Sequence, residues 1–345
     1  MFMNETGRFL NGWRHAGVFA RRNGALCVLI FVLFFALIRY DGFYNQFNVS
    51  SILSSTELLC IGLMAIGLTF VIAAGEIDLS VAGVAVCSSV VAALLAPFGV
   101  LTALGGAVGI GALLGLVNGL LVAYVGLPSF IVTLAMLLAT RGLSLMISER
   151  NKIPVDYSFP LVGFYNMKIG GLIPAPLLVV LAIAAIAWVL FSRARFGLHV
   201  LAIGGDRGAS ELMGLRSPRI RAAVFVITGA LSGLAGAFLL AKTTTGNPLE
   251  AQGWELTAIA AVVLGGTSLA GGRGSIISTL VGVALLAIVF QILNYENGQG
   301  IPINSYWQNV IRGMFVLAIV VVQALASGNG PRIRRRNQQL DGVPA

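Results

Sequence analysis

The stretch RARFGLHVLAIGGDRGASELMGLRSPRIR, residues 193–221, carries six arginines and two carboxylates in the middle of an apolar chain. It lies between two apolar runs, Ile173 to Ser192 and Ala222 to Ala241, each long enough to cross a bilayer as a helix. A segment with this charge must sit in water, and arginine in a short loop is typical of the cytoplasmic side of a membrane protein. The pattern predicts an all-α polytopic membrane protein with a cytoplasmic loop at residues 192–221.

The composition indicates the same class. Of the 345 residues, 57% are hydrophobic and 10% are charged, whereas a soluble domain has roughly a quarter charged residues. The net charge of +9 does not indicate a nucleic-acid partner, because the arginines cluster in the two tails and the central stretch, as topology signals do. Three cysteines without paired spacing, Cys27, Cys60 and Cys87, argue against a disulfide framework and against a metal site.

Splitting the apolar runs into segments of about 20 residues predicts ten spans. From Leu79 to Thr140 there is no charged residue. Pro97 and Pro128 divide this run, because proline disfavours helix in the residue before it. The transmembrane domain is expected at 24–326, between tails at 1–23 and 327–345. The expected spans are 23–38, 51–74, three between 79 and 148, 173–191, 222–241, 254–272, 274–293 and 307–325.

Charge asymmetry predicts the orientation. Ten spans would place four segments on the same side of the membrane: the N-terminal tail, the central loop, Arg273 and the C-terminal tail. These segments hold 15 of the 22 Lys and Arg residues. Lys and Arg accumulate on the cytoplasmic side of short loops and tails. Both tails are therefore expected in the cytoplasm.

Two further patterns concern packing. A shift of 198 residues superposes six identical residues, among them Glu57 on Glu255 and Gly67 on Gly265, which suggests a repeat of spans 1–4 in spans 7–10. Glycine recurs at every fourth residue at 111, 115 and 119, and again at 229 and 233. Because this spacing lets helix backbones approach closely, the helices that carry it are expected to be buried in the bundle.

Six residues are candidates for lining a translocation path: Glu57, Asp78, Ser80, Asn118, Trp254 and Glu255. Carboxylates beside spans are costly and usually functional, but Asp78 followed by Ser80 is also an ordinary helix start. Glu255 next to Trp254 is suited to bind a sugar; the alternative is an interfacial tryptophan beside a hydrated carboxylate. Asn118 would line a pore or form an interhelical hydrogen bond.

The central loop contains a segment, residues 208–214, with the pattern of a short amphipathic helix closed by glycine. Such a helix is suited to dock into a groove of a soluble partner, and the alternative is a helix lying on the membrane surface. The chain has no nucleotide-binding P-loop, because none of its three lysines follows a glycine. If ATP drives transport, another polypeptide hydrolyses it.

Three groups of residues are distinctive. They are Gly75-Glu-Ile-Asp78-Leu-Ser80, then Ala194-Arg-Phe-Gly197 with Ala202-Ile-Gly-Gly205 and Met213-Gly214, and finally the segment from Glu255 to Gly274. Together they resemble the ribose-type permease subunits of bacterial ABC sugar importers, and the likeness runs from the second to the tenth span. Two positions depart from the family pattern: Glu76 replaces a usual glycine, and Thr257 replaces a frequent aspartate. If these positions face the path, the substrate or its handling differs from ribose.

The resemblance implies a ten-span permease in the bacterial inner membrane that pairs with a second permease copy or paralogue. It also implies a cytoplasmic ATPase, which uses ATP and Mg, and a periplasmic substrate-binding protein, while this chain itself binds no cofactor. The ATPase-coupling segment it implies comprises Gly204, Gly205, Asp206, Arg207, Glu211, Leu212, Met213 and Gly214.

We therefore expect a transporter subunit rather than an enzyme, importing a monosaccharide or a similar polyhydroxylated solute. A secondary transporter driven by an ion gradient would need intramembrane carboxylates as ion sites, and the third and fourth spans contain none. A passive channel is the remaining alternative. It would show flux without either energy source.

Overall fold

The structure is a computed structural model that describes residues 24–40 and 42–298, together with positions 307, 310, 313, 314 and 317. Seven helical segments in this part are long and apolar enough to cross a membrane. The chain is therefore an all-α polytopic membrane protein, as the sequence predicts. The two tails and nearly all of the tenth span expected at 307–325 lie outside the described residues, so the count of ten stays a prediction.

The helical elements follow one another with short connections. They are α2 (Gly24–Arg39), α3 (Gln46–Leu53), the π-helical turn η1 (Glu57–Ile61), α4 (Gly62–Ala73), α5 (Val81–Leu95), the 3₁₀ turn η2 (Ala96–Phe98), α6 (Val100–Ala123), α7 (Ser129–Ile147), α8 (Pro160–Asn166), α9 (Ala175–Ser192), α10 (Arg195–Gly205), α11 (Arg207–Leu212), α12 (Ser217–Thr243), α13 (Trp254–Leu264) and α14 (Ile276–Gly298).

Two short antiparallel strand pairs tie the connections between helices together. Strand β1 (Ile153–Pro154) pairs with β4 (Thr245–Gly246), and β2 (Lys168–Ile169) pairs with β3 (Ile173–Pro174). The first pair joins the segment after α7 to the end of α12.

Helix α4 is the centre of the fold. All of its residues are buried, and it packs against α12, α13, α14, α9 and α10. A helix that is apolar all round lies either in the core of a protein or in a membrane, and α4 lies in the core. Cys60, which precedes α4, and Cys87 on α5 are both buried and free.

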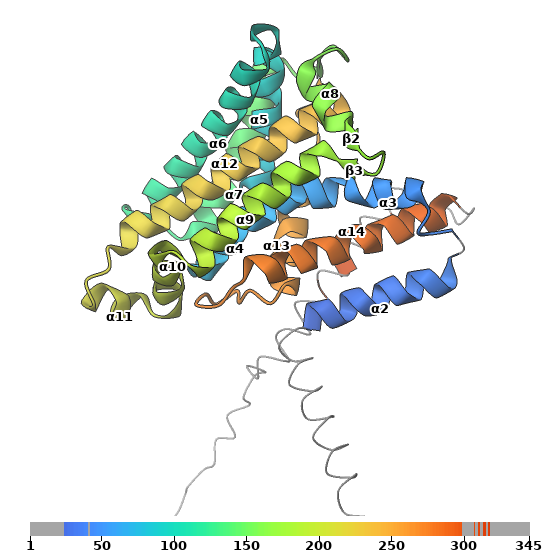
Figure 1. The fold of residues 1–345 in the computed structure, drawn as a ribbon. Coiled ribbons are helices and arrows are strands. Elements are labelled where there is room, and N and C mark those ends of the chain that lie inside the picture. Colours follow the sequence, from blue (N-terminus) through green and yellow to red (C-terminus); the bar gives the residue numbers. More distant parts are fainter. Residues whose placement is uncertain are drawn as a thin grey trace, which may run out of the picture.

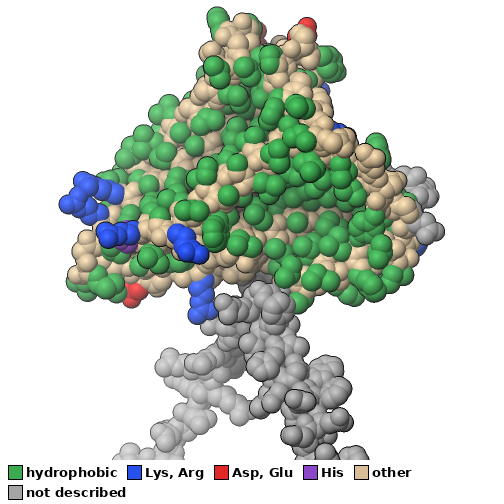
Figure 2. Space-filling view, viewed as in Figure 1, with side chains coloured by type: hydrophobic (Ala, Val, Ile, Leu, Met, Phe, Trp, Pro, Cys, Tyr) green, Lys and Arg blue, Asp and Glu red, His purple; other side chains and the backbone are tan. Residues whose placement is uncertain are grey.

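Helices α5, α6 and α12 pack side by side, with α10 and α11 at one end of this layer and α8 with the β2–β3 hairpin at the other (Figure 1). Figure 2 shows that hydrophobic side chains cover most of the visible face, and that Lys and Arg gather at the corner formed by α10 and α11. The distribution fits a protein whose sides contact lipid and whose charged corner contacts water.

The glycine spacing brings α6 and α12 into direct backbone contact, as expected. A Cβ atom on Gly229 would lie 2.2 Å from the Gly111 carbonyl oxygen, and one on Gly115 would lie 2.3 Å from that of Phe225. The opposite face of α6 is open, with Leu101 82% exposed and Leu113 54% exposed. The expectation that this helix is buried in the bundle is therefore wrong for its outer face.

Three expected spans differ in the structure. The span expected at 23–38 is present as α2, an apolar helix of 16 residues that is shorter than the seven candidate spans. The span expected at 51–74 is interrupted, because α3 ends at Leu53 and the chain resumes through the π-helical turn at Glu57. The span expected at 254–272 ends at Leu264. At about 1.5 Å per residue, a helix of 11 residues is too short to cross a bilayer. Beyond it, Gly266, Gly271 and Gly272 have positive φ, a conformation that does not continue a helix.

The central loop is also shorter than expected. It ends where α12 begins at Ser217, so Arg219 and Arg221 lie on a helix and not in the loop.

The order of the elements can be compared with the repeat expected from the sequence. A shift of 198 residues carries Glu57 of η1 onto Glu255 of α13, and Val81 of α5 onto Thr279 of α14. The order of the elements agrees with the expected repeat as far as α14. The expected partner of α6 in this repeat, the tenth span, lies almost wholly outside the described residues.

The contact between α6 and α12 predicts unequal effects of two glycine substitutions. Gly229→Ala is expected to lower the thermal midpoint of the detergent-solubilised protein, because overpacking against backbone costs about 1–3 kcal/mol or more. Gly109 lies on α6, and a Cβ atom added there would have no neighbouring atom within 4 Å. Gly109→Ala is therefore expected to leave the midpoint unchanged or slightly raised. Equal midpoints for the two variants would contradict the close contact.

Candidate functional site

Three segments that are far apart in the sequence meet backbone to backbone beside the charged corner. They are the end of α4, the end of α10 and the loop after α13. The amide of Gly272 donates to the carbonyl oxygen of Ala73 at 3.0 Å, and a Cβ atom on Gly204 would lie 1.9 Å from the same oxygen. We call this contact the glycine junction, and its members are Gly75, Gly204, Gly205, Gly271 and Gly272.

A side chain has no room at Gly204, Gly271 or Gly272. A Cβ atom on Gly271 would lie 2.6 Å from the Gly204 carbonyl oxygen and 2.8 Å from the Cα atom of Gly75. Gly75, Gly271 and Gly272 also have positive φ values of 79°, 82° and 71°, which other residues rarely adopt. The three motifs that are distinctive in the sequence therefore converge at one place, which their separation in the chain did not reveal.

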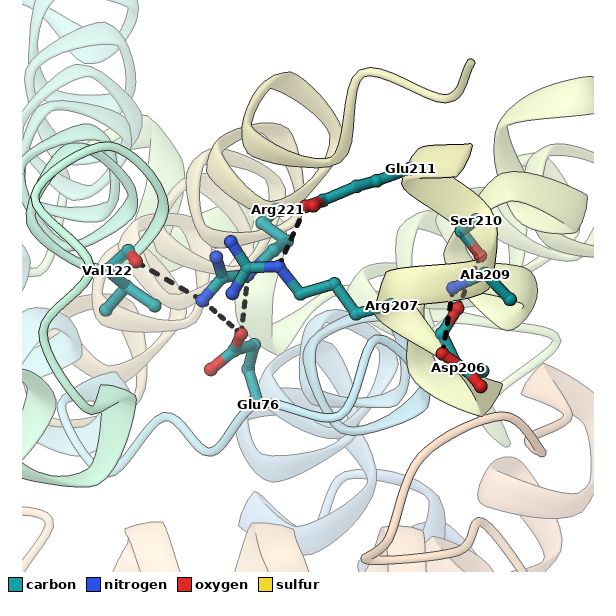
Figure 3. Close-up of polar contacts among 8 residues, drawn as sticks. All are labelled: Glu76, Val122, Asp206, Arg207, Ala209, Ser210, Glu211 and Arg221. Atoms are coloured by element: carbon teal, nitrogen blue, oxygen red, sulfur yellow. Dashed lines mark hydrogen bonds and ion pairs between the residues drawn. The ribbon is translucent and has the colours of Figure 1, made fainter. Parts of the chain in front are cut away.

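A buried ion pair lies beside the junction (Figure 3). The Arg221 guanidinium contacts the Glu76 carboxylate through Nε at 2.6 Å and Nη2 at 2.5 Å, and Nη2 also donates to the Val122 carbonyl oxygen at 3.2 Å. The two side chains are only 5% and 12% exposed. The pair fixes the start of α12 to the turn after α4 and to the end of α6.

Sequence reasoning missed this pair. It treated Glu76 as a departure from a family pattern and Arg221 as one of several loop arginines. The available signal was that a carboxylate beside a span needs a partner, and that Arg221 is the loop arginine next to the following apolar run.

Asp78, Ser80 and Asn118 form a buried hydrogen-bonded chain. Asp78 Oδ1 accepts from the Ser80 amide at 2.8 Å and from the Ser80 hydroxyl at 2.6 Å. The Asn118 side-chain amide donates to the Ser80 hydroxyl oxygen at 2.9 Å, which links α6 to the start of α5. The interhelical hydrogen bond expected at Asn118 is present. Helix α5 begins at Val81 with Ser80 as its N-cap residue, and Asp78 forms a turn before it without capping the helix. A role in the translocation path stays a prediction for all three residues.

Asp78 lies between two spans and is 1% exposed. Burial raises the pKa of its carboxyl to about 6, and the hydrogen bonds from Ser80 offset part of this effect. The segment is held on its other side by Thr133, whose hydroxyl oxygen accepts from the Leu79 amide at 3.1 Å.

The short helix expected in the central loop is present as α11. The Asp206 side chain caps it by accepting from the Ala209 amide at 2.9 Å, and Arg207 pairs with Glu211 at 3.0 Å. Leu212 and Met213 are 91% and 73% exposed. Gly204, in contrast, packs against the chain's own α4. The role of the segment from Gly204 to Gly214 in contacting an ATPase stays a prediction.

The remaining candidates lie away from the junction. Glu255, in the first turn of α13, lies 3.8 Å from Arg141 of α7, so this arginine has a partner within the protein. Trp254 is half-buried. Glu57 begins η1, at the break that follows α3. The structure does not bring these residues together with Asp78.

A hollow of about 540 Å³ opens at the opposite end of the molecule. It is lined by the end of α5, the start of α6 and residues 153–160. Helix α6 has 24 residues and spans about 36 Å, which separates the hollow from the ion pair at its other end. The two ends are therefore a bilayer thickness apart.

Comparison with known proteins places the chain in a family. Residues 50–320 match the family described as branched-chain amino acid transport system / permease component. The chain is 35% identical over 311 residues to a ribose import permease protein of Bacillus subtilis (strain 168), covering 89% of this chain and 93% of that protein.

Two further relatives are named for other sugars. A D-allose transport system permease protein of Escherichia coli (strain K12) is 33% identical over 301 residues, covering 86% of this chain and 90% of that protein. An L-arabinose ABC transporter permease protein of Azospirillum brasilense is 34% identical over 311 residues, covering 88% of each. No solved structure matches the chain significantly.

The ion pair predicts a large cost for removing one charge. Glu76→Gln leaves a buried guanidinium without its carboxylate, so the free energy of unfolding is expected to fall by about 3–5 kcal/mol. Glu211→Gln breaks a pair whose side chains are 45% and 49% exposed and is expected to cost about 1 kcal/mol or less. Thermal and denaturant unfolding in detergent measure both variants. Equal losses would show that the Glu76 pair contributes no more than a surface pair.

Asp78→Asn is expected to remove one pH dependence of stability. The native carboxyl keeps its proton up to about pH 6, whereas in the unfolded chain it loses it near 3.9. Its stabilising contribution is therefore complete at low pH and is lost as the pH rises through about 6. The thermal midpoint of the variant should therefore rise relative to that of the wild type as the pH increases from about 4 to about 7. Parallel curves would mean that Asp78 does not titrate in this range.

Proposed function

The chain belongs to the family of permease components of branched-chain amino acid transport systems, and we propose that it is the membrane-spanning subunit of an ATP-binding-cassette importer for a monosaccharide or a similar polyhydroxylated solute. The sugar substrate is supported by the relatives, which are named for ribose, allose and arabinose. The observation that carries the proposal is a polytopic helical chain whose charged corner holds a short helix, α11, with the exposed apolar side chains Leu212 and Met213 at its end.

In this proposal a separate ATPase binds ATP and Mg and supplies the energy. Support comes from the absence of a P-loop in the sequence. Helix α11 presents Leu212 and Met213 to a groove of that ATPase in the helix-in-groove manner. The charge asymmetry supports an orientation with α11 and both tails in the cytoplasm.

The opposite end, with its hollow of about 540 Å³, then faces the periplasm and a substrate-binding protein. A second permease copy or paralogue completes the path across the bacterial inner membrane. The family membership disfavours an ion-driven transporter.

The glycine junction supplies a route for force. A push on α11 reaches α10 through the single residue between them, Asp206. At the end of α10, Gly204 touches Ala73 and Gly272 with backbone atoms. Close-packed backbone has no compressible side chain to absorb the motion. Movement of α10 therefore passes to α4 and to the loop after α13. The Glu76–Arg221 pair carries the same motion to α12.

The docking role of α11 predicts loss of coupling in a double variant. Leu212→Asp with Met213→Asp is expected to reduce ribose uptake at least tenfold in proteoliposomes that contain the chain, its ATPase and its binding protein, because the groove contact loses its apolar side chains. Stimulation of ATP hydrolysis by the binding protein should fall in parallel.

Leu212→Met keeps an apolar side chain of similar volume and is the matched control, expected to retain uptake. Copurification of the ATPase with each variant measures the contact directly. Wild-type uptake and copurification in the double variant would refute the assignment of α11.

A further inference from the structure

A polar segment interrupts the first long span of the structure. The run Gln46–Ala73 is apolar enough to cross a membrane, yet it contains Ser54-Ser-Thr-Glu57. Helix α3 ends before this segment, Ser55 lies in no helix, and Glu57 begins a π-helical turn. We call residues 54–57 the polar break. Interrupted spans and π turns are tolerated in a membrane where they line a cavity, and they are frequent at functional sites.

A lysine from another helix reaches the polar break. The ammonium group of Lys242, in the last turn of α12, donates to the hydroxyl oxygen of Thr56. Lys242 is exposed and Glu57 is half-buried. The break therefore brings one carboxylate, one ammonium group and a row of hydroxyl groups to one region.

Tyr165 of α8 adds a polar group from a third element. Its side chain is 6% exposed, and its hydroxyl has no hydrogen-bond partner among the described residues. The ring packs against Phe238 of α12, with centroids 6.1 Å apart. Burial raises the pKa of Tyr165, and the nearby Cys60 and Glu57 raise it further. Phe238 lies one helical turn before Lys242, so the Tyr165 ring packs on the same side of α12 that carries Lys242 toward the polar break.

The exposed ammonium group of Lys242 must lie in contact with water or a ligand. A half-buried carboxylate and an exposed ammonium group are too costly to face lipid, so the surface that they share faces an aqueous space. Lys242 lies 21 residues after Arg221 on α12, which corresponds to about 31 Å. The polar break is therefore on the membrane side opposite to the glycine junction and α11.

We propose that the polar break, with Lys242 and Tyr165, is a binding site for a neutral polyhydroxylated solute at the entrance of the translocation path. The inference rests on the proposed function and specifies where the permease itself holds its substrate. The carboxylate accepts hydrogen bonds, the ammonium group donates them, and the serine, threonine and tyrosine hydroxyls do both, as sugar hydroxyls require. Because the two charges are opposite, the site favours a neutral polar ligand over a free cation or anion.

Cysteine labelling tests occupancy of the site. Ser55→Cys is introduced into the chain of the complete importer in proteoliposomes, and a membrane-impermeant methanethiosulfonate reagent is added from the side of the hollow. Labelling is expected, and millimolar ribose, allose or arabinose should slow it at least threefold. Asn151→Cys, an exposed residue that does not line the hollow, is the matched control and should label at a rate that the sugar does not change. No labelling of Ser55→Cys, or labelling that all three sugars leave unchanged, would refute the site.

Transport measurements separate this site from a structural role. Glu57→Gln and Lys242→Gln are expected to lower sugar uptake at least tenfold while ATP hydrolysis stimulated by the binding protein stays within twofold of wild type. Lys242→Arg keeps the charge and should restore most of the uptake. Joint loss of uptake and hydrolysis would indicate a structural role and overturn the inference, as would wild-type uptake in both Gln variants.

Sugar uptake by the wild-type importer distinguishes a failure of the proposed function from a failure of the proposed binding site. If it moves none of the three sugars with ATP, the proposed function fails. If it imports a sugar and the Glu57 and Lys242 variants behave like wild type, only the binding site fails.

Discussion

The contact of Gly204 with Ala73 and Gly272 is the constraint on which the rest of the structure depends. At this point three chain segments approach with no side chain between them, so the relative positions of α4, α10 and α13 are fixed by backbone geometry. The Glu76–Arg221 pair extends the same constraint to α12 and α6. An arrangement of this kind is stiff, because neither glycine contacts nor a buried ion pair can adjust without losing their geometry.

Two helices join the glycine junction to the other side of the membrane. One is α4, which is buried along its whole length and shares a hydrogen bond of 2.8 Å between Thr69 and Thr279 of α14. The other is α12, which begins near Arg221 and ends near Lys242. The proposed solute site lies where these two helices end, next to the π-helical turn at Glu57. A rigid shift at the junction would therefore move two walls of that site relative to α8, which carries Tyr165.

Charged residues beside the spans have compensating groups in the structure. Glu76 pairs with Arg221, Glu255 with Arg141, and the ammonium group of Lys242 meets the polar break. Charges near a membrane persist where a partner or water compensates them. Glu76 shows that a departure from a family pattern does not need to change the substrate, because its carboxylate faces an arginine of the same chain.

The sequence by itself determined the class of the protein, most of its spans, the short helix α11 and the face on which α6 meets α12. These features follow from local signals: apolar length, proline breaks and glycine at every fourth residue. Only the tertiary structure decided which motifs meet. The glycine junction, the Glu76–Arg221 pair and the hydrogen bond from Lys242 to Thr56 join residues separated by more than sixty positions. The early end of α13 and the break at Ser55 also depend on neighbours, because an apolar run continues as a helix unless backbone contacts from elsewhere favour another path.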